Sequence, residues 1–198
     1  FEQVHQSANC ASPEPYPKLD SGALGMIVLP PTIDGDGFNP TAYQEALALA
    51  RESGVQVSHY YFHWGDIEKE PGIYDWTVPD YIVEANVLED LELSIVISVI
   101  RTTVRGRIPT DLVGLAFDDP VFVQRLSGFF AAFAERYEGQ LDYLSVGNEV
   151  NNYFASRRDE IPAYITAFDE TRKAIHAVNP DLPVGIIFAY HDAETLDA

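Results

Sequence analysis

Cysteine is almost absent from the 198-residue sequence, and the lone Cys10 can form neither an intramolecular disulfide nor a zinc site built on cysteine pairs. Neither a Gly-x-Gly-x-x-Gly nor a Gly-x-Ser-x-Gly motif occurs, which gives no support for a nucleotide cofactor or for serine hydrolase chemistry. No apolar run reaches the ~20 residues that a membrane-spanning helix needs. The sequence therefore predicts a protein without a metal, a cofactor or a membrane span.

Positive charge is also scarce. Twelve Lys and Arg residues stand against 31 Asp and Glu residues, which gives a formal net charge of -19. A surface of this sign repels nucleic acids and anionic lipids. We therefore expect no nucleic-acid partner and no membrane partner, although the charge does not identify a neutral one.

The chain divides into an irregular leader and one domain of alternating elements. Residues 1–22 contain three prolines and show no periodicity, which predicts a leader or linker. From residue 23 to residue 198, short apolar runs alternate with segments of helical periodicity. The expected strands are residues 25–29, 55–62, 93–100, 141–146 and 184–188. The expected helices begin at Pro40 after an Asn39 cap, near Pro79, at Pro120 after an Asp119 cap, and near Ile161.

This alternation predicts an α/β fold. Strands 93–100 and 184–188 are apolar almost throughout, as in parallel sheets covered by helices. A doubly wound nucleotide-binding sheet would have a glycine-rich first turn that cradles a phosphate, whereas the first turn here, residues 30–37, is acidic. We therefore expect a (β/α)₈ TIM barrel, of which the chain supplies about the first five βα units.

The number of units also predicts an open sheet. A complete barrel takes ~250 residues, so we expect the chain to end before strands six to eight. The first or the fifth strand would then have an unpaired edge. We expect the missing C-terminal half of the barrel or a partner subunit to cover it.

The strongest candidate for chemistry is Glu149. It follows the expected fourth strand within the motif Ser-Val-Gly-Asn-Glu-Val, and barrel enzymes place their active sites at the carboxyl ends of the strands. A carboxyl group at this position can act as a general acid on a glycosidic oxygen, while Asn148 binds a neighbouring sugar hydroxyl. The alternative is that Asn148 and Glu149 only cap the following loop.

A second candidate region, Phe-His-Trp-Gly-Asp-Ile-Glu-Lys-Glu-Pro-Gly-Ile-Tyr-Asp-Trp at residues 62–76, follows the second strand. Aromatic side chains beside polar ones suit a sugar ring, whose C–H face packs on an aromatic face. Trp64 could therefore contact a sugar or pack within the loop, whereas Trp76 is expected to pack.

These two motifs together resemble the large clan of retaining glycoside hydrolases with (β/α)₈ barrels. That clan includes β-galactosidases, β-xylosidases, β-1,3-glucanases and cellulase-like enzymes, and the resemblance covers roughly residues 24–188. It implies that the protein hydrolyses O-glycosidic bonds in a carbohydrate, with Glu149 as the acid/base. It further implies that the protein is secreted or otherwise extracytoplasmic.

The resemblance also implies substrate-binding positions. It makes Asn148 the partner of the sugar 2-hydroxyl and places Trp64 near the cleaved bond. His59 stands where many clan members have an arginine, which is a departure from the pattern. Arg101 at the end of the third strand and Tyr153 just past the Asn-Glu motif could also line the cleft.

The nucleophile is missing from the chain. In the clan it is a second glutamate at the end of strand seven, and a retaining mechanism needs its carboxyl group about 5–5.5 Å from the acid/base. We therefore expect the nucleophile to lie outside this chain and the chain by itself to be inactive. The alternatives are a non-catalytic carbohydrate-binding barrel or pseudoenzyme, or an unrelated α/β enzyme with a fortuitous Asn-Glu pair.

A small basic patch stands out in the acidic sequence. Arg101, Arg105 and Arg107 could contact an acidic group on a substrate, such as that of a uronic acid. Alternatively, they pair with nearby carboxylates at Asp111, Asp118 or Asp119.

Overall fold

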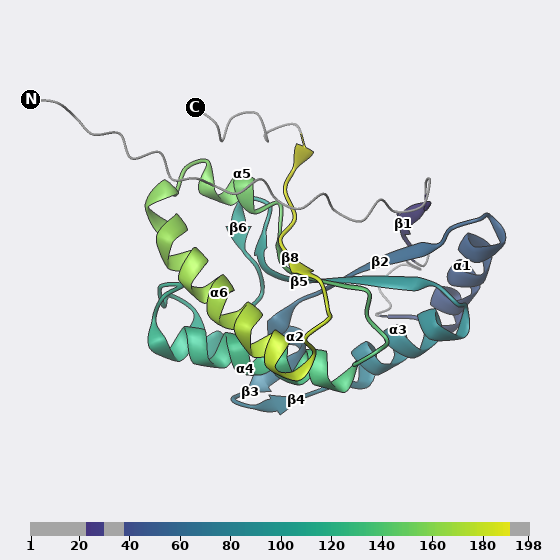
Figure 1. The fold of residues 1–198 in the computed structure, drawn as a ribbon, viewed down its shortest axis with the longest axis horizontal. Helices are drawn as coiled ribbons and strands as arrows, with labels where there is room; N and C mark the ends of the chain where they lie inside the picture. Colours follow the sequence, from purple (N-terminus) through teal and green to yellow (C-terminus); the bar gives the residue numbers. More distant parts are fainter. Residues whose placement is uncertain (1–22, 30–37, 191–198) are drawn as a thin grey trace, which may run out of the picture.

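The computed structural model describes residues 23–29 and 38–190 (Figure 1). The expected leader at residues 1–22, the acidic first turn at residues 30–37 and the segment 191–198 lie outside the described residues, as does Cys10. No helix within the described ranges is both long and apolar enough to cross a membrane.

Strands and helices alternate along the described chain, as the sequence predicts. The strands of the main sheet are β1 (Gly25–Ile27), β2 (Val57–Phe62), β5 (Glu92–Arg101), β6 (Val104–Arg105), β7 (Tyr143–Asn148) and β8 (Val184–Gly185). The long helices are α1 (Pro40–Glu52), α3 (Thr77–Leu88), α4 (Pro120–Arg136) and α6 (Ile161–Val178). The short elements are α2 (Trp64–Ile67), β3 (Glu68–Glu70), β4 (Ile73–Tyr74), η1 (Thr110–Leu112), α5 (Val150–Phe154) and η2 (Arg158–Glu160).

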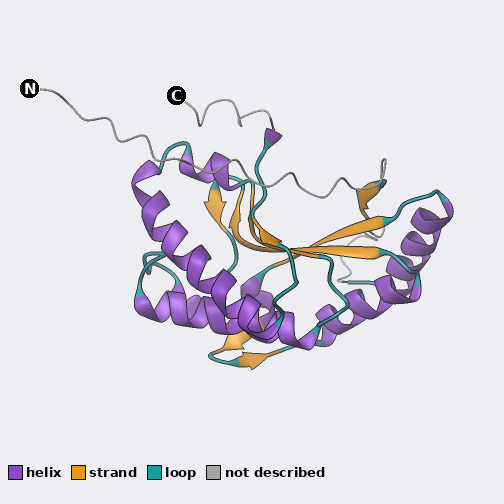
Figure 2. Ribbon diagram, viewed as in Figure 1, coloured by secondary structure: helices purple, strands orange, loops and turns teal. Residues whose placement is uncertain are grey.

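The main sheet has the parallel strand order expected for part of a barrel. Its strands lie in the order β1-β2-β5-β7-β8 with every neighbouring pair parallel, and β6 folds back antiparallel onto β5. Figures 1 and 2 show α3, α4 and α6 together on one side of the sheet. A doubly wound sheet would reverse its strand order and carry helices on both faces. The expected α/β barrel class is therefore confirmed.

Two helices begin where the sequence predicts. The Asn39 side chain accepts a hydrogen bond from the Ala42 N–H at 3.1 Å, and Pro40 is the first residue of α1. The Asp119 side chain accepts one from the Val121 N–H at 2.8 Å, and Pro120 is the first residue of α4. Each cap satisfies an N–H that has no partner within its helix.

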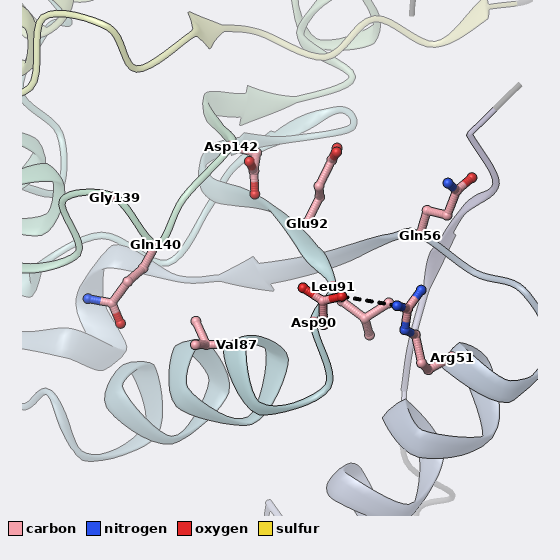
Figure 3. Close-up of a pocket in the computed structure, with 9 residues that line it drawn as sticks. All are labelled: Arg51, Gln56, Val87, Asp90, Leu91, Glu92, Gly139, Gln140 and Asp142. Carbon is pink, nitrogen blue, oxygen red and sulfur yellow. Dashed lines mark hydrogen bonds and ion pairs between the residues drawn. The ribbon is translucent and has the colours of Figure 1, made fainter. Parts of the chain in front are cut away.

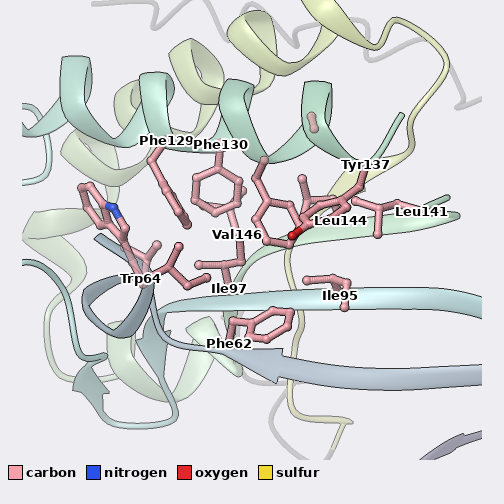
Figure 4. Close-up of a cluster of buried hydrophobic side chains, with 14 of the residues drawn as sticks. Phe62, Trp64, Ile95, Ile97, Phe129, Phe130, Tyr137, Leu141, Leu144 and Val146 are labelled. Carbon is pink, nitrogen blue, oxygen red and sulfur yellow. The ribbon is translucent and has the colours of Figure 1, made fainter. Parts of the chain in front are cut away.

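The core lies between the sheet and the helices (Figure 4). Apolar side chains of β5 and β7 pack against aromatic side chains of α4, and fully buried examples are Ile95, Ile97, Leu144, Val146, Phe129, Phe130 and Phe133. Burying a side chain of this size stabilises the fold by about 1.5–3 kcal/mol. This single apolar layer fixes which face of each strand points away from the helices.

The opposite side of the sheet, which we call the inner face, carries His59 and Tyr61 on β2, Ser94 on β5 and Ser145 on β7. All four are half-buried. The strand register places His59 beside Ser94, and it aligns Tyr61 and Ser145 on either side of Val96. In a closed barrel this face is the interior. Because β1 and β8 end the strand order, both expected open edges occur within the described part of the chain.

The structure departs from the sequence prediction in the lengths of elements. Residues 64–74, expected as a loop, form the helix α2 and the β3–β4 hairpin. The first and fifth strands are shorter than expected. Each has one neighbouring strand among the described residues, so ladder hydrogen bonds form on one side only.

Candidate functional site

The carboxyl end of β7 turns sharply before α5, and two residues in the left-handed region make this turn. They are Gly147, with φ of 107°, and Glu149, with φ of 50°. A Cβ at Gly147 would lie 2.9 Å from Val150 Cγ1 and 3.0 Å from the Tyr164 hydroxyl oxygen, so glycine is needed there for space as well as for conformation. The Tyr164 hydroxyl in turn donates to the main-chain oxygen of Val146.

Residues after β8 hold the same turn from the other side. The Val150 N–H donates to the Ile187 oxygen at 3.0 Å, and the Ile187 N–H donates to the Gly147 oxygen at 3.3 Å. The buried Asn151 side chain bonds both the N–H and the carbonyl of Ala189, at 2.8 and 3.1 Å. The backbone that carries Glu149 is therefore fixed by β7, α6 and the segment after β8.

The Glu149 carboxyl group is half-buried and lightly engaged. Asn152 Nδ2 donates to it at 3.4 Å, and no Lys or Arg in the described ranges forms an ion pair with it. Tyr61 on the inner face lies close enough for the charge of Glu149 to affect the Tyr61 pKa. Burial raises the pKa of Tyr61, and the negative charge of Glu149 raises it further. Glu149 thus combines a fixed backbone with a carboxylate that has no cationic partner in the described part of the chain, which leaves it available to a ligand.

Asn148 lies beside the end of β5. Its main-chain oxygen accepts a hydrogen bond from the Thr102 N–H at 3.0 Å, and it pairs in the strand register with Arg101. Its side chain is half-buried, and no described residue forms a hydrogen bond with it. The structure therefore brings Asn148, Glu149 and the backbone of Arg101 together at one end of the sheet.

The strand β2 contributes His59 and Tyr61 to the inner face, because alternate residues of a strand point to the same side, and the extended backbone at His63 continues this alternation past the strand. His59 Nδ1 lies 2.9 Å from Ser94 Oγ, near the middle of the sheet, and burial lowers the His59 pKa. His63 follows the carboxyl end of β2. Sequence analysis missed Tyr61, although the alternation from His59 was sufficient to find it.

The spacing of His59 and His63 suits a metal site on a helix but not on this strand. Four residues of a strand separate the two imidazoles by about 13 Å, which is too far for both to bind one ion. Within the described ranges, no three His, Cys, Asp or Glu side chains form a group that could hold a metal.

Trp64 lies in the core and not at the site. Its side chain has no exposed surface, stacks on Phe129 at a ring distance of 5.6 Å and packs edge-on against Phe122 (Figure 4). Its Nε1 donates to Glu68 Oε2 at 2.5 Å. With both ring faces covered, the indole has no surface left for a sugar, and the predicted contact is replaced by a packing role.

Tyr153 is also buried. Its ring packs against Phe117 and Phe154, and its hydroxyl donates to Glu160 Oε2 at 2.9 Å. The Arg157 guanidinium lies 4.5 Å from the ring centre. The Tyr153 side chain therefore connects α5 to η2 and to the segment before α4, and it does not line the site.

The basic patch divides into paired and unpaired residues. Arg105 lies 3.7 Å from Glu160, and Arg107 lies 2.9 Å from Asp66. Neither uses a carboxylate predicted from the sequence. Asp111 pairs with Arg125 at 2.9 Å, and Asp119 caps α4. Arg101 forms no ion pair with any described residue.

A separate hollow lies at the amino ends of the strands (Figure 3). It is lined by residues that precede β2, β5 and β7, including Gln56, Leu91 and Asp142, and Arg51 bonds Asp90 there at 3.0 Å. Glu149 lies at the opposite end of β7. In barrel enzymes the amino ends of the strands serve stability and the carboxyl ends serve chemistry, so this hollow is not the candidate site.

Comparison with known proteins identifies the architecture. No family model matches the chain, and the search of curated proteins returns no match. Solved structures do match. They include the exo-beta-1,4-mannosidase Op5Man5 from Opitutaceae bacterium strain TAV5, with a TM-score of 0.66, 17% identity, and coverage of 81% of this chain and 30% of that one.

Two further structures support the same architecture. A family 39 glycoside hydrolase from Bacteroides cellulosilyticus WH2 has a TM-score of 0.60 and 18% identity, over 82% of this chain and 30% of that one. GH5_18 from Bifidobacterium longum subsp. longum has a TM-score of 0.61 and 12% identity, over 77% of this chain and 39% of that one. The chain thus has the fold of glycoside hydrolase barrels and spans less than half the length of these proteins.

Proposed function

We propose that the chain supplies the acid/base half of the active site of a retaining glycosidase. The observation that carries the proposal is the position of Glu149. Its carboxylate follows the carboxyl end of a parallel strand, on a backbone fixed from three sides, without a cationic partner among the described residues. The likeness in fold to glycoside hydrolases supports the same proposal.

In this mechanism Glu149 acts twice. Its carboxyl proton passes to the glycosidic oxygen as the bond to the anomeric carbon breaks and the nucleophile bonds to that carbon. The resulting carboxylate then takes a proton from water, whose oxygen attacks the anomeric carbon and displaces the nucleophile. Asn148, next in the chain, is positioned to hold a neighbouring sugar hydroxyl. Tyr61, with a raised pKa, remains a hydrogen-bond donor beside Glu149.

The second carboxylate is proposed to come from outside the five described parallel strands. Three acidic side chains of the neighbouring loops already have partners: Asp66 pairs with Arg107, Glu68 with Arg125, and Glu160 with Arg105. Three further βα units would close the sheet and place a carboxylate opposite Glu149. The same units would cover the open edges at β1 and β8.

The test uses the protein expressed from the entire natural reading frame. Glu149→Gln is expected to abolish hydrolysis of glycosides with poor leaving groups. It should largely spare the first step with 2,4-dinitrophenyl glycosides, measured as the initial burst of dinitrophenol, because a good leaving group needs no proton; the later step with water still needs Glu149 as base. Asn152→Ala, which removes only a 3.4 Å contact to Glu149, is the matched control and should change both rates far less. Equal loss on both substrate types would contradict the acid role.

A non-catalytic carbohydrate-binding barrel is the second candidate. One observation favours it: the three acidic residues Asp66, Glu68 and Glu160 on the loops beside Glu149 are each paired with an arginine, so none of them is free to act as a nucleophile. Such a protein would bind sugars without turnover, and Glu149→Gln would change only the affinity.

A further inference from the structure

Arg101 is the last residue of β5 and lies beside the motif that carries Glu149. It pairs in the strand register with Asn148, so the two backbones are about 4.8 Å apart. Its side chain is exposed. A ligand held by Asn148 and Glu149 would therefore also lie within reach of its guanidinium group.

The charges around Arg101 distinguish it from the neighbouring arginines. Arg105 and Arg107 each face a carboxylate, whereas Arg101 forms neither an ion pair nor a side-chain hydrogen bond with a described residue. Acidic residues outnumber basic ones by 31 to 12 in this protein. An arginine that has no carboxylate partner among the described residues of such a chain can bind an external anion.

The backbone around Arg101 is held tightly. Thr102 has φ of 56°, a conformation that a β-branched residue rarely adopts, and its N–H bonds the Asn148 oxygen. On the other side of the turn, a Cβ at Gly106 would lie 1.7 Å from the Ser98 oxygen, so only glycine fits. Backbone strain of this kind persists where the surrounding structure imposes it, and it is concentrated at functional sites.

His63 provides a neutral donor on the β2 side of Arg101. Its Nδ1 is buried without a partner among the described residues. Burial lowers the pKa of His63, and the positive charge of Arg107 lowers it further; Asp66 opposes this, and Arg101 adds a smaller lowering effect. The imidazole is therefore uncharged at neutral pH, so His63 adds no positive charge to that of Arg101.

We infer that Arg101 forms a subsite for an anionic group, a carboxylate or a sulfate, on the sugar that binds at Glu149. This inference rests on the proposed function and adds the class of substrate. A guanidinium group binds either anion through two parallel N–H donors. His63 would donate a further hydrogen bond to the same sugar.

The overall charge of the protein limits the size of this anion. A net charge of -19 opposes the approach of any polyanion. A ligand with a single charged substituent is repelled only weakly, because at physiological salt the field of distant charges is screened over about 8 Å. We therefore assign Arg101 to one charged group on a sugar and not to a polyanionic chain.

The test uses calorimetry to measure ligand binding to the Glu149→Gln variant of the protein expressed from the entire natural reading frame. The ligands are methyl β-glucuronide, the 6-sulfate of methyl β-glucoside and neutral methyl β-glucoside, followed by the matching galactose series. In at least one of the two sugar series, we expect an anionic glycoside to bind about tenfold tighter than the neutral one. This gain in affinity corresponds to the free energy of one charge-assisted hydrogen bond. Which anion gains more distinguishes the carboxylate from the sulfate.

Variants of Arg101 complete the test. Arg101→Gln should remove the advantage of the anionic ligand, and Arg101→Lys should retain part of it as a single point charge. Arg172→Gln is the matched control, because Arg172 is an exposed arginine on α6 without a described ion pair. It should leave the advantage intact.

The outcomes separate this inference from the proposed function. If neutral glycosides are bound and turned over through Glu149, but anionic ones gain nothing from Arg101, only the inference fails. Equal weakening of neutral and anionic ligands by Arg101→Gln also overturns it. If no glycoside of either kind is bound or cleaved, the proposed function fails and the inference falls with it.

Discussion

Glu68 and Arg125 form an ion pair at 2.9 Å that ties the loop after β2 to α4, and the Glu68 side chain has no exposed surface. The same carboxylate accepts hydrogen bonds from Trp64 Nε1 at 2.5 Å and from the Gly72 N–H at 2.7 Å. One buried charge therefore holds α2, the β3–β4 hairpin and α4 in their relative positions.

Removing this charge should destabilise the whole domain. Glu68→Gln would remove the buried one of the two carboxylates that lie 2.9 Å from Arg125, and the loss on breaking such a buried pair is about 3 kcal/mol. Denaturant unfolding measures the change in the free energy of unfolding. Glu170→Gln is the control, because its partner Lys173 is exposed, and its unfolding midpoint should stay unchanged. Equal midpoints for both variants would show that the buried pair contributes nothing.

A substitution at Thr102 should increase the free energy of unfolding, in contrast to Glu68→Gln. Thr102→Gly should raise the free energy of unfolding by about 1 kcal/mol, because strain at a left-handed, β-branched residue exceeds the added entropy of the unfolded chain. Thr103→Gly is the control. Thr103 has no positive φ, so only the entropic loss remains and the variant should be less stable than the parent. A loss of stability in Thr102→Gly would mean that the threonine conformation is not strained.

The order and class of the elements could be predicted from the sequence because both depend on local patterns. Asn39 and Asp119 cap helices through bonds to residues two or three positions away. The position of Glu149 at the end of β7 followed from the apolar run that precedes it. These features need no information about distant parts of the chain.

The roles of the aromatic residues could not be predicted in this way. Trp64 is buried because Glu68, Arg125 and the α4 ring Phe129 meet around it, and α4 lies more than fifty residues further along the chain. The partner of Arg105 is Glu160 and not a nearby aspartate, because α5 and η2 bring Glu160 back to the β5–β6 turn. Such contacts depend on how helices pack, which periodicity does not encode.

Trp64 is accordingly predicted to act on stability and not on sugar binding. Trp64→Phe keeps a ring against Phe129 but removes the N–H donor to Glu68, which should cost about 1–3 kcal/mol for the buried acceptor left behind. Thermal or urea unfolding measures this loss, and calorimetry on the folded variant measures sugar affinity. Weaker sugar binding at unchanged stability would mean that Trp64 contributes to sugar binding after all.

The stability of the protein should depend on pH through His59. Burial lowers its pKa from the ordinary value of 6.5, so the folded protein favours the neutral imidazole. As the pH falls below 6.5, the unfolded chain binds a proton that the folded one does not, and stability is lost. Above that pH both states are neutral and the contribution is constant.

Urea unfolding at pH 7.5 and at pH 5 tests this with the His59→Gln variant. The parent protein should lose more stability than the variant between the two pH values, since the acidic residues contribute equally to both proteins. Parallel losses would show that His59 titrates normally in the folded state.

The 198-residue chain by itself should not hydrolyse glycosides. A retaining mechanism needs a second carboxylate about 5–5.5 Å from the first, and three acidic side chains on the loops beside Glu149, those of Glu160, Asp66 and Glu68, are held by Arg105, Arg107 and Arg125. Release of nitrophenol from aryl glycosides measures turnover, with the whole-reading-frame protein as the positive control. Turnover by the purified chain that disappears in Glu149→Gln would mean that one of these paired carboxylates, or one outside the described residues, serves as the nucleophile. Turnover that persists in Glu149→Gln would remove Glu149 from the chemistry altogether.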